Sequence, residues 1–409
     1  MTFYEFFAGG GMVRAGLGVR WRCLFANDVS PQKARIYRRN LGGDTLVLTD
    51  IAALTSADLP GAPDLVWGSF PCQDLSVAGA GAGLSGQRSG SFWSLIGLLH
   101  ELKDQGRAPP LIVLENVLGA LTANGGADFT ALCRAVAGLG YDLGAVVMDA
   151  ADFLPQSRPR LFIIAVREGI TPPDAVVALG PQSHWHPPAI VTAYQRLPPR
   201  MQKHWRWWAM PTPPLRVLKL ADLIETELPA DNWDTPLKTN RLLLMMNETH
   251  LQKVALAKAQ GGTVIGTIYK RTRVEQGQKF QRAEVRFDDL AGCLRTPGGG
   301  SSLQHLLVVS PEAIRSRVMS PRETARLMGL RDSYVLPEKS LEAYQLTGDG
   351  VAVPVVRYLA KRLLGPIVAG ESPWKHGAVS SPFASQAKSP SSVKTHRNQL
   401  PQRVLILRK

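Results

Sequence analysis

The first half of the chain alternates short apolar runs with amphipathic stretches, and this alternation constrains the fold more than any other feature. The runs that predict strands are Thr2–Phe7, Arg22–Ala26, Thr45–Leu48, Leu65–Gly68, Leu111–Leu114, Ala145–Met148 and Leu161–Val166. The stretches that predict helices are Pro31–Leu41, Phe92–Lys103 and Asp128–Leu139. Strands separated by helices form βαβ units, so we predict an α/β fold with a doubly wound, mostly parallel sheet. In such a sheet, ligands bind at the carboxyl ends of the strands.

The regular pattern stops near residue 180 and returns after residue 310. In between, Pro and Trp cluster, as in KHWRWWAMPTPP at 203–214. We expect these tryptophans to form the core of a separate small, irregular or mixed domain; the alternative is a platform on which bases stack. One helix is predicted near Arg241–Gln260 and one strand at Thr263–Tyr269, and helical patterns resume at Pro321–Gly329 and Val351–Leu364.

These changes predict a core domain at 1–180, an inserted domain at 181–310, a return to the core domain at 311–370 and a tail at 371–409. The tail is rich in Ser, Pro and Lys, which is typical of disordered segments. The chain has a net charge of +14, of which +7 falls in the insert, +6 in the tail and only +1 in the remainder. The insert therefore either faces a polyanion such as nucleic acid or has an ordinary solvated basic face.

The composition excludes several classes of protein. Hydrophobic residues make up 45% of the 409 residues, which is enough for a sizeable core. No run of 18 apolar residues exists and the first ten residues lack a signal-peptide pattern, so we expect a cytoplasmic protein with no membrane partner. Four cysteines without a CxxC motif fit neither a disulfide framework nor a zinc site, and we expect no metal.

A glycine-rich corner, FFAGGGMVRAG at 6–16, follows the first predicted strand and precedes a helix. Glycines at such a corner let the backbone approach a ligand. Asp28 ends the second strand and Asp50 follows the third, so both carboxylates lie at the same edge of the sheet. An acid about 20 positions after the corner suits ribose hydroxyls, and a second suits an adenine edge. Together they indicate a nucleoside-containing cofactor, although each aspartate alone could simply cap a helix.

Cys72 follows the strand Leu65–Gly68 in the sequence FPCQ, which places it on a stiff loop at the carboxyl edge of the sheet. A thiol there is a candidate nucleophile if its surroundings favour the thiolate. The alternative is a buried, unreactive cysteine, which is the commoner fate of this residue type.

Three charged residues converge on the same edge. Glu115 ends an apolar strand, where partial burial would keep its carboxyl protonated and able to donate to a ring nitrogen. Gln156, Arg158 and Arg160 precede another apolar strand, and alternation places both arginines on one face, ready for a carbonyl oxygen and a phosphate. Glu115 with either arginine could instead be a structural ion pair.

The order of these motifs resembles the DNA (cytosine-5) methyltransferases of the prokaryotic type. The series runs from the FxGxG corner through PCQ, ENV and QxRxR to a basic insert, then SPRETARLMGL at 320–330 and GDGVAVPVV at 348–356. The resemblance covers residues 1–365 apart from the insert. It implies a Rossmann-like class I methyltransferase fold with an inserted target-recognition domain.

The resemblance also implies roles for individual residues. Cys72 would be the nucleophile, Glu115 the acid at cytosine N3, Arg160 the partner of cytosine O2, and Arg158 a support for the loop and the phosphate. Those implied at the S-adenosylmethionine site are Phe7, Ala8, Gly9, Gly11, Asp28, Asp50, Ile51, Pro71, Asp349 and Val351. Those implied at the substrate loop, which closes over the base, are Gln73, Ser76, Arg88 and Gln156.

The implied reaction moves a methyl group from S-adenosylmethionine to C5 of a flipped-out cytosine in a specific double-stranded DNA sequence, through a covalent bond between Cys72 and C6. The enzyme would act without a metal, as a monomer on DNA in the cytoplasm, associated with the nucleoid. It would be a solitary methylase or would share its sequence with a restriction endonuclease that it need not contact.

Two departures from the family pattern stand out. Asp349 occupies a position where the family usually has Asn, and Met12 one where a further glycine is frequent. Three alternatives stay open: a tRNA-methylating relative, an inactive DNA-binding protein and an unrelated Rossmann oxidoreductase. The insert lacks the Cys-Phe-Thr motif that is typical of the tRNA-methylating relatives. Intact Cys72, Glu115 and Arg160 argue against an inactive DNA-binding protein, and the missing GxGxxG motif argues against an oxidoreductase.

Overall fold

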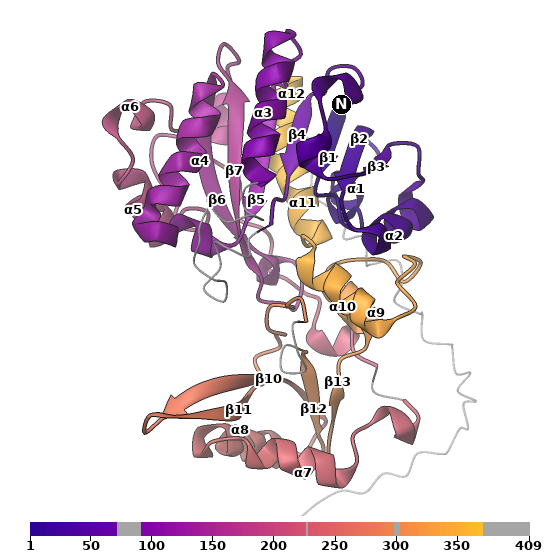
Figure 1. Cartoon of the computed structure of the whole chain (residues 1–409). Coiled ribbons are helices and arrows are strands. Elements are labelled where there is room, and N and C mark those ends of the chain that lie inside the picture. Colours follow the sequence, from indigo (N-terminus) through magenta and orange to yellow (C-terminus); the bar gives the residue numbers. More distant parts are fainter. Residues whose placement is uncertain (72–90, 226–227, 298–302, 371–409) are drawn as a thin grey trace, which may run out of the picture. The chain divides into compact units, whose positions relative to one another are not determined.

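A seven-stranded sheet organises residues 1–167 (Figure 1). The computed structural model describes residues 1–71, 91–225, 228–297 and 303–370. The strands are β1 (Thr2–Phe6), β2 (Arg22–Asp28), β3 (Leu46–Leu48), β4 (Leu65–Gly68), β5 (Leu111–Asn116), β6 (Tyr141–Asp149) and β7 (Pro159–Arg167). Their order is β3-β2-β1-β4-β5-β7-β6, and only β7 runs against its neighbours. The predicted doubly wound, mostly parallel sheet is confirmed.

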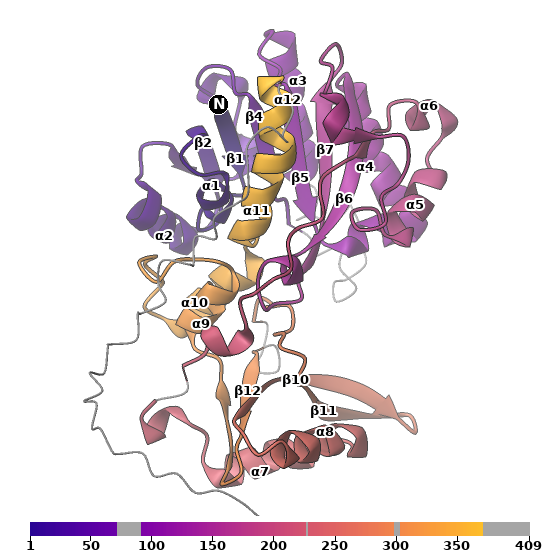
Figure 2. The same ribbon diagram turned by 180° about the vertical axis from the view of Figure 1, so that it is seen from behind.

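Helices cover both faces of this sheet. On one face lie α3 (Ser91–Asp104) and α4 (Ala127–Gly138), and on the other lie α1 (Met12–Leu17), α2 (Pro31–Leu41) and α11 (Val353–Leu359), each side with its own apolar core. Figures 1 and 2 show the two coverings from opposite sides. Helix α11 continues through a π-helical turn at Ala360–Leu364 into α12 (Gly365–Ala369). A Cβ on Gly16 would lie 2.5 Å from Val356, so glycine is what lets α1 and α11 pack this closely.

The tryptophan-rich segment packs on the large sheet, so the expectation that it forms the core of the small domain was wrong. The segment contains β8 (Val177–Ala178), α5 (Pro188–Gln195), α6 (Pro199–Gln202) and β9 (Trp207–Trp208). The Trp208 indole donates to the Ile164 carbonyl at 3.1 Å, and the Trp205 ring lies 6.2 Å from Phe129 on α4. Backbone hydrogen bonds at Leu143 also cover the outer strand β6. The proline-rich segment has only two short strands of its own, and it buries its large rings by packing on the edge of the seven-stranded sheet.

A second, antiparallel sheet has the order β11-β10-β12-β13. Its strands are β10 (Val264–Glu275), β11 (Gln278–Arg286), β12 (His305–Val309) and β13 (Ile314–Val318). Helices α7 (Pro236–Leu244) and α8 (Glu248–Ala259) cover one face. The single helix predicted near Arg241–Gln260 was wrong, because Asn247 starts a new helix by accepting a hydrogen bond from the His250 N–H at 3.1 Å. The domain boundaries stay a prediction.

Two further helices lie between β13 of the second sheet and α11 on the large sheet: α9 (Pro321–Leu327) and α10 (Ser340–Asp349). A buried ion pair between Arg317 of β13 and Glu323 of α9 joins the second sheet to the first of them.

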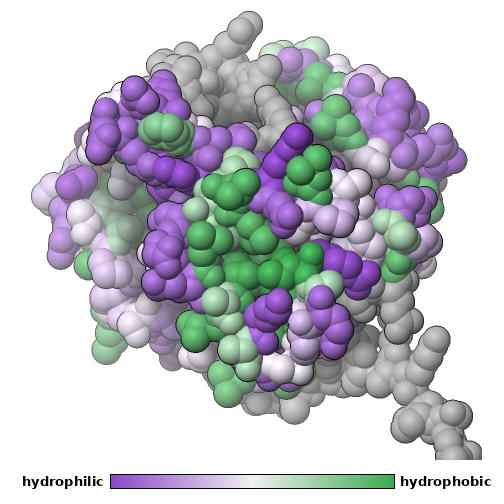
Figure 3. Space-filling model, turned by 90° about the horizontal axis from the view of Figure 1, so that it is seen from below, coloured by the Kyte–Doolittle hydropathy of each residue, from purple (hydrophilic) through white to green (hydrophobic). Residues whose placement is uncertain are grey.

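Leucines on α7 and α8 are exposed to solvent. Figure 3 looks from below the view of Figure 1 and shows apolar side chains gathered in the middle of that face. The exposed leucines of these two helices are Leu237, Leu244, Leu251 and Leu256. Within the described ranges, no helix has both the length and the apolar character to cross a membrane.

Candidate active site

The candidate site is a pocket at the carboxyl edge of the large sheet. Its volume is about 1350 Å³, and residues that follow β1, β2, β4 and β5 line it. A single drug-sized ligand occupies roughly 300–1,000 Å³, so the pocket has room for more than one group. The residues predicted from the sequence that line it are Phe7, Ala8, Gly9, Asp28, Asp50, Ile51, Pro71, Glu115, Arg160, Asp349 and Val351.

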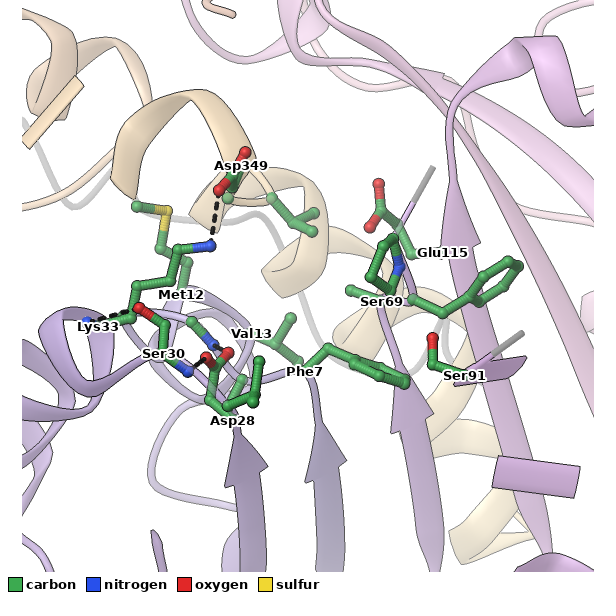
Figure 4. Close-up of a pocket in the computed structure, with 18 of the residues that line it drawn as sticks. Phe7, Met12, Val13, Asp28, Ser30, Lys33, Ser69, Ser91, Glu115 and Asp349 are labelled. Atoms are coloured by element: carbon green, nitrogen blue, oxygen red, sulfur yellow. Dashed lines mark hydrogen bonds and ion pairs between the residues drawn. The ribbon is translucent and has the colours of Figure 1, made fainter. Parts of the chain in front are cut away.

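The glycine corner and Asp28 form one side of the pocket (Figure 4). Phe7 and Gly9 have positive φ angles of 60° and 56°, a conformation that is strained for Phe7. The buried Asp28 carboxylate accepts the Gly9 N–H at 2.7 Å and the Ser30 N–H at 2.8 Å, which fixes the corner against β2. Gly11 does not line the pocket. It packs against α2, where a Cβ on Gly11 would come 2.1 Å from Leu41.

Asp50 and Ile51 form the neighbouring rim. Asp50 is exposed and accepts the Ala52 N–H at 2.9 Å, so its carboxylate caps the short 3₁₀ turn that begins at Ile51. Ile51 is buried beside it and gives this part of the pocket an apolar floor.

Glu115 and Arg160 lie together in the opposite part of the pocket, across Phe7 from Asp28 (Figure 4 labels Glu115). The Arg160 Nε lies 3.4 Å from the Glu115 carboxylate, and the Glu115 side chain is 8% exposed. Because β7 runs antiparallel to β5, the start of β7 meets the end of β5, and this brings Arg160 beside Glu115. Burial raises the pKa of Glu115, while Arg160 and then Arg158 partly oppose that rise.

Arg158 lies behind the pocket lining, where it binds backbone carbonyls. Its guanidinium donates to the carbonyls of Leu294, Gly348 and Gly350 at 2.7, 2.6 and 2.7 Å. Burial lowers the pKa of Arg158, and the nearby Arg160 guanidinium lowers it further. The side chain therefore ties β7 to two distant loops.

Gln156 makes a similar connection and is also absent from the lining. Its amide nitrogen donates to the Leu327 carbonyl at 2.6 Å, and its amide oxygen accepts the Leu294 N–H at 3.2 Å. Gln156 is fully buried, and it holds the segment near Leu294 against the large sheet.

Comparison with known proteins identifies the family. The model of the C-5 cytosine-specific DNA methylases matches residues 1–365 of the chain. The chain belongs to this family.

Relatives of the methylase span its length. The Type II methyltransferase M.DsaV of Dactylococcopsis salina is 24% identical over 369 residues, which cover 90% of this chain and 87% of that protein. M.HpaII of Haemophilus parainfluenzae is 24% identical over 383 residues, which cover 89% of each chain. The fold is similar to that of the S. pombe Dnmt2 methyltransferase, with a TM-score of 0.53, 19% identity and coverage of 90% of this chain and 99% of that one.

Asp349, at the position where the resemblance implies asparagine, has two partners at the pocket rim. Lys33 of α2 pairs with its carboxylate at 2.6 Å, and the Thr296 hydroxyl donates to its other oxygen. Only a carboxylate can form this ion pair with Lys33. The substitution therefore joins α2 to α10 across the pocket mouth (Figure 4).

Cys293 is a pocket residue that the sequence did not reveal. Its Sγ lies 3.4 Å from an Arg158 nitrogen and 3.8 Å from an Arg160 nitrogen. Burial alone would raise the pKa of the Cys293 thiol, but the two guanidinia outweigh it and hold that pKa below its ordinary value. Cys293 is 133 positions from Arg160 in the sequence and belongs to no recognised motif, so only the three-dimensional structure reveals its place.

Four predicted residues, Cys72, Gln73, Ser76 and Arg88, lie outside the described residues. The segment that precedes them is fixed, because the Asn116 amide donates to the Phe70 carbonyl at 3.2 Å. Asn116 is the middle residue of ENV, so this motif holds the strand end that leads to Pro71.

Proposed function

We propose that the methylase transfers a methyl group from S-adenosylmethionine to C5 of a cytosine in a specific sequence of duplex DNA. The observation that carries the proposal is one pocket with two differently built parts. The Gly9–Asp28 corner forms one part, and the buried Glu115–Arg160 pair forms the other. The first suits a nucleoside cofactor and the second suits a pyrimidine ring.

The first part fits S-adenosylmethionine better than a dinucleotide. Asp28 and Asp50 place two carboxylates at this part of the pocket, and the amine of Lys33 is paired with Asp349. The two carboxylates would repel a pyrophosphate, whereas they would attract a cationic sulfonium nucleoside. When bound, S-adenosylmethionine would supply an electrophilic methyl group, held by Phe7, Gly9, Asp28, Ile51 and Val351.

The second part fits the polar edge of cytosine. Because the pKa of Glu115 is raised, its carboxyl can stay protonated and donate to N3. Arg160 would donate to O2, so both groups stabilise the negative charge that develops on the ring when a nucleophile adds to C6.

Cys72 is the nucleophile in this proposal. Its thiolate would form the Sγ–C6 bond, and the ring electrons would move toward N3, which takes the Glu115 proton, and leave C5 nucleophilic. The methyl group would pass to C5 as S-adenosylhomocysteine leaves; a base then removes the C5 proton, the Sγ–C6 bond breaks with release of the thiolate, and N3 returns its proton to the Glu115 carboxylate. A stacked duplex hides C6, so the cytosine must flip out, and the volume of the pocket supports this.

The remaining expectations also belong to this proposal. The methylase would act as a monomer on DNA, associated with the nucleoid. A restriction endonuclease that cuts the same sequence could be its functional partner without touching it.

Transfer of labelled methyl groups tests the function. Wild-type protein is incubated with labelled S-adenosylmethionine and either duplex DNA or tRNA, and label should enter duplex DNA alone. Glu115→Gln should lower the rate at least about 100-fold because it removes the acid. Label in tRNA alone would establish the alternative substrate, and no label in either would refute the activity.

A further inference from the structure

The β10–β11 hairpin extends beyond the second sheet as a two-stranded ribbon. Residues 264–268 of β10 pair with β12, and the last two of them, 267 and 268, pair with β11 as well. Residues 269–275 pair only with β11. Residues 271–274 and 276–281 are exposed. Figures 1 and 2 show this part reaching past α8. Among the described residues, the outer ribbon therefore has open edges and extends beyond α8.

The ribbon is basic, whereas the helices behind its sheet expose leucines among their polar side chains. Residues 269–286 contain six basic residues against two acids, Glu275 and Glu284. The basic residues are Lys270, Arg271, Arg273, Lys279, Arg282 and Arg286. On the other side of the sheet, α7 and α8 expose leucines. The net charge of +4 therefore makes the ribbon a surface that attracts a polyanion.

The inner end of the ribbon contacts the active pocket. The Tyr269 hydroxyl donates to the carbonyl of Cys293, which lines the pocket. The guanidinium of Arg295, also a lining residue, lies 5.7 Å from the centre of the Tyr269 ring, and that of Arg271 lies 5.8 Å from it. Because alternate strand residues share a face, Tyr269, Arg271 and Arg273 form a row that leads away from the pocket, with steps of about 7 Å.

One carboxylate holds both arginines of this row. Glu284 of β11 pairs with Arg271 at 3.3 Å and with Arg273 at 2.5 Å. Both guanidinia are thereby fixed on one face while about half of each side chain stays exposed. Among the described residues, Lys270 and Lys279 have no ion-pair partner, and alternation places both on the opposite face. The ribbon therefore has oriented arginines on one face and free lysines on the other.

We propose that this outer ribbon, residues 270–282, enters the major groove of the DNA duplex beside the target cytosine, where Arg271 and Arg273 read base edges. The inference rests on the proposed function. The major groove admits a two-stranded ribbon, and an arginine that donates two hydrogen bonds to guanine O6 and N7 is the commonest specific contact. Arg273 lies about 13 Å along the strand from Tyr269, so the sequence read contains guanine within about four base pairs of the cytosine.

The test replaces both arginines by lysine, which keeps the charge and removes the forked donor geometry. Wild type and R271K/R273K methylate a duplex library of random sequence, and bisulfite sequencing reads every methylated cytosine. Wild type should methylate one motif that contains guanine. The variant should accept other bases at the guanine position, with its preference for the motif at least about tenfold weaker, while its binding to non-cognate DNA stays within about twofold.

Two further variants separate reading from folding and from charge. Lys253→Ala with Lys258→Ala removes two positive charges from α8, on the other face of the same sheet, and should leave the motif unchanged. Lys279→Ala should weaken binding to all sequences alike and reduce the salt slope by about one. Near-ultraviolet circular dichroism and binding of S-adenosylmethionine check that each variant is folded.

The possible results distinguish this proposal from the proposed function. If wild type methylates one motif and R271K/R273K keeps that motif at the same discrimination, the ribbon does not read DNA. A uniform loss across all sequences would likewise overturn base reading by the arginines. If wild type methylates no duplex at all, the proposed function itself is wrong.

Discussion

Replacement of Arg158 by methionine should destabilise the methylase rather than slow its chemistry alone. The guanidinium donates to three backbone carbonyls, of Leu294, Gly348 and Gly350. Each hydrogen bond to a charged group contributes about 1.5–3 kcal/mol. The variant recovers part of the sum because the buried guanidinium no longer has to be desolvated. A loss of about 3–5 kcal/mol remains, as expected when one partner of a buried charged network is removed.

Urea unfolding followed by tryptophan fluorescence measures this loss. With a slope near 3 kcal/mol per M, the midpoint should fall by about 1–2 M. Arg160→Met is the matched control, because within the part of the chain that the structure describes Arg160 binds only one carbonyl, that of its neighbour Pro159, besides Glu115 and the Cys293 thiol. Its midpoint should change much less while its methyl-transfer rate falls. An Arg158→Met protein with an unchanged midpoint but no transfer would refute the structural role.

Two further predictions concern a buried acid and the pocket rim. Burial raises the pKa of Glu5 to about 8 from an ordinary 4.5, and Arg14 opposes this only in part. The folded state therefore holds this proton more tightly than the unfolded state does. The resulting stabilisation, on the order of 5 kcal/mol, is lost as pH rises from about 4.5 to about 8, and the urea midpoint of Glu5→Gln should lack this fall. Asp349→Asn removes the ion pair with Lys33, so the KM for S-adenosylmethionine should rise by up to about fivefold, and Lys33→Met should add nothing further. The account of Glu5 would be contradicted if the urea midpoints of wild type and Glu5→Gln changed with pH in the same way. The account of Asp349 would be contradicted if Asp349→Asn and Lys33→Met raised the KM additively.

The sequence predicted the large sheet and several residues that line the pocket, because both depend on local pattern. Each strand of the sheet is a short apolar run, and parallel strands bring their carboxyl ends to one edge. That rule placed Asp28 and Glu115 in one pocket without further information. Because β7 runs antiparallel to β5, the start of β7 lies at the same edge of the sheet as the end of β5. Arg160, at the start of β7, therefore meets the residues at the carboxyl ends of the parallel strands.

The errors arose where long-range packing decides the structure. The Trp205–Trp208 segment has little strand pattern of its own and buries its rings against β6, β7 and α4, which are distant in sequence. A helix break at Asn247 is a single capping interaction within a stretch that is helical on both sides. Cys293 lies at the pocket because residues distant in sequence hold its segment there: Gln156 and Arg158 bind Leu294, and Tyr269 binds the Cys293 carbonyl.

The central claim is that Cys72 attacks cytosine C6, and a covalent trap tests it most directly. Duplex DNA with 5-fluorocytosine at the target position keeps the Sγ–C6 bond after methyl transfer, because no base can remove the fluorine as a proton. Wild type should form a complex that survives denaturation, and peptide mapping should place the DNA on Cys72. Cys293→Ala should trap equally well and Cys72→Ser not at all. A complex mapped to Cys293, whose thiol lines the pocket, or full methyl transfer by Cys72→Ser, would contradict the account.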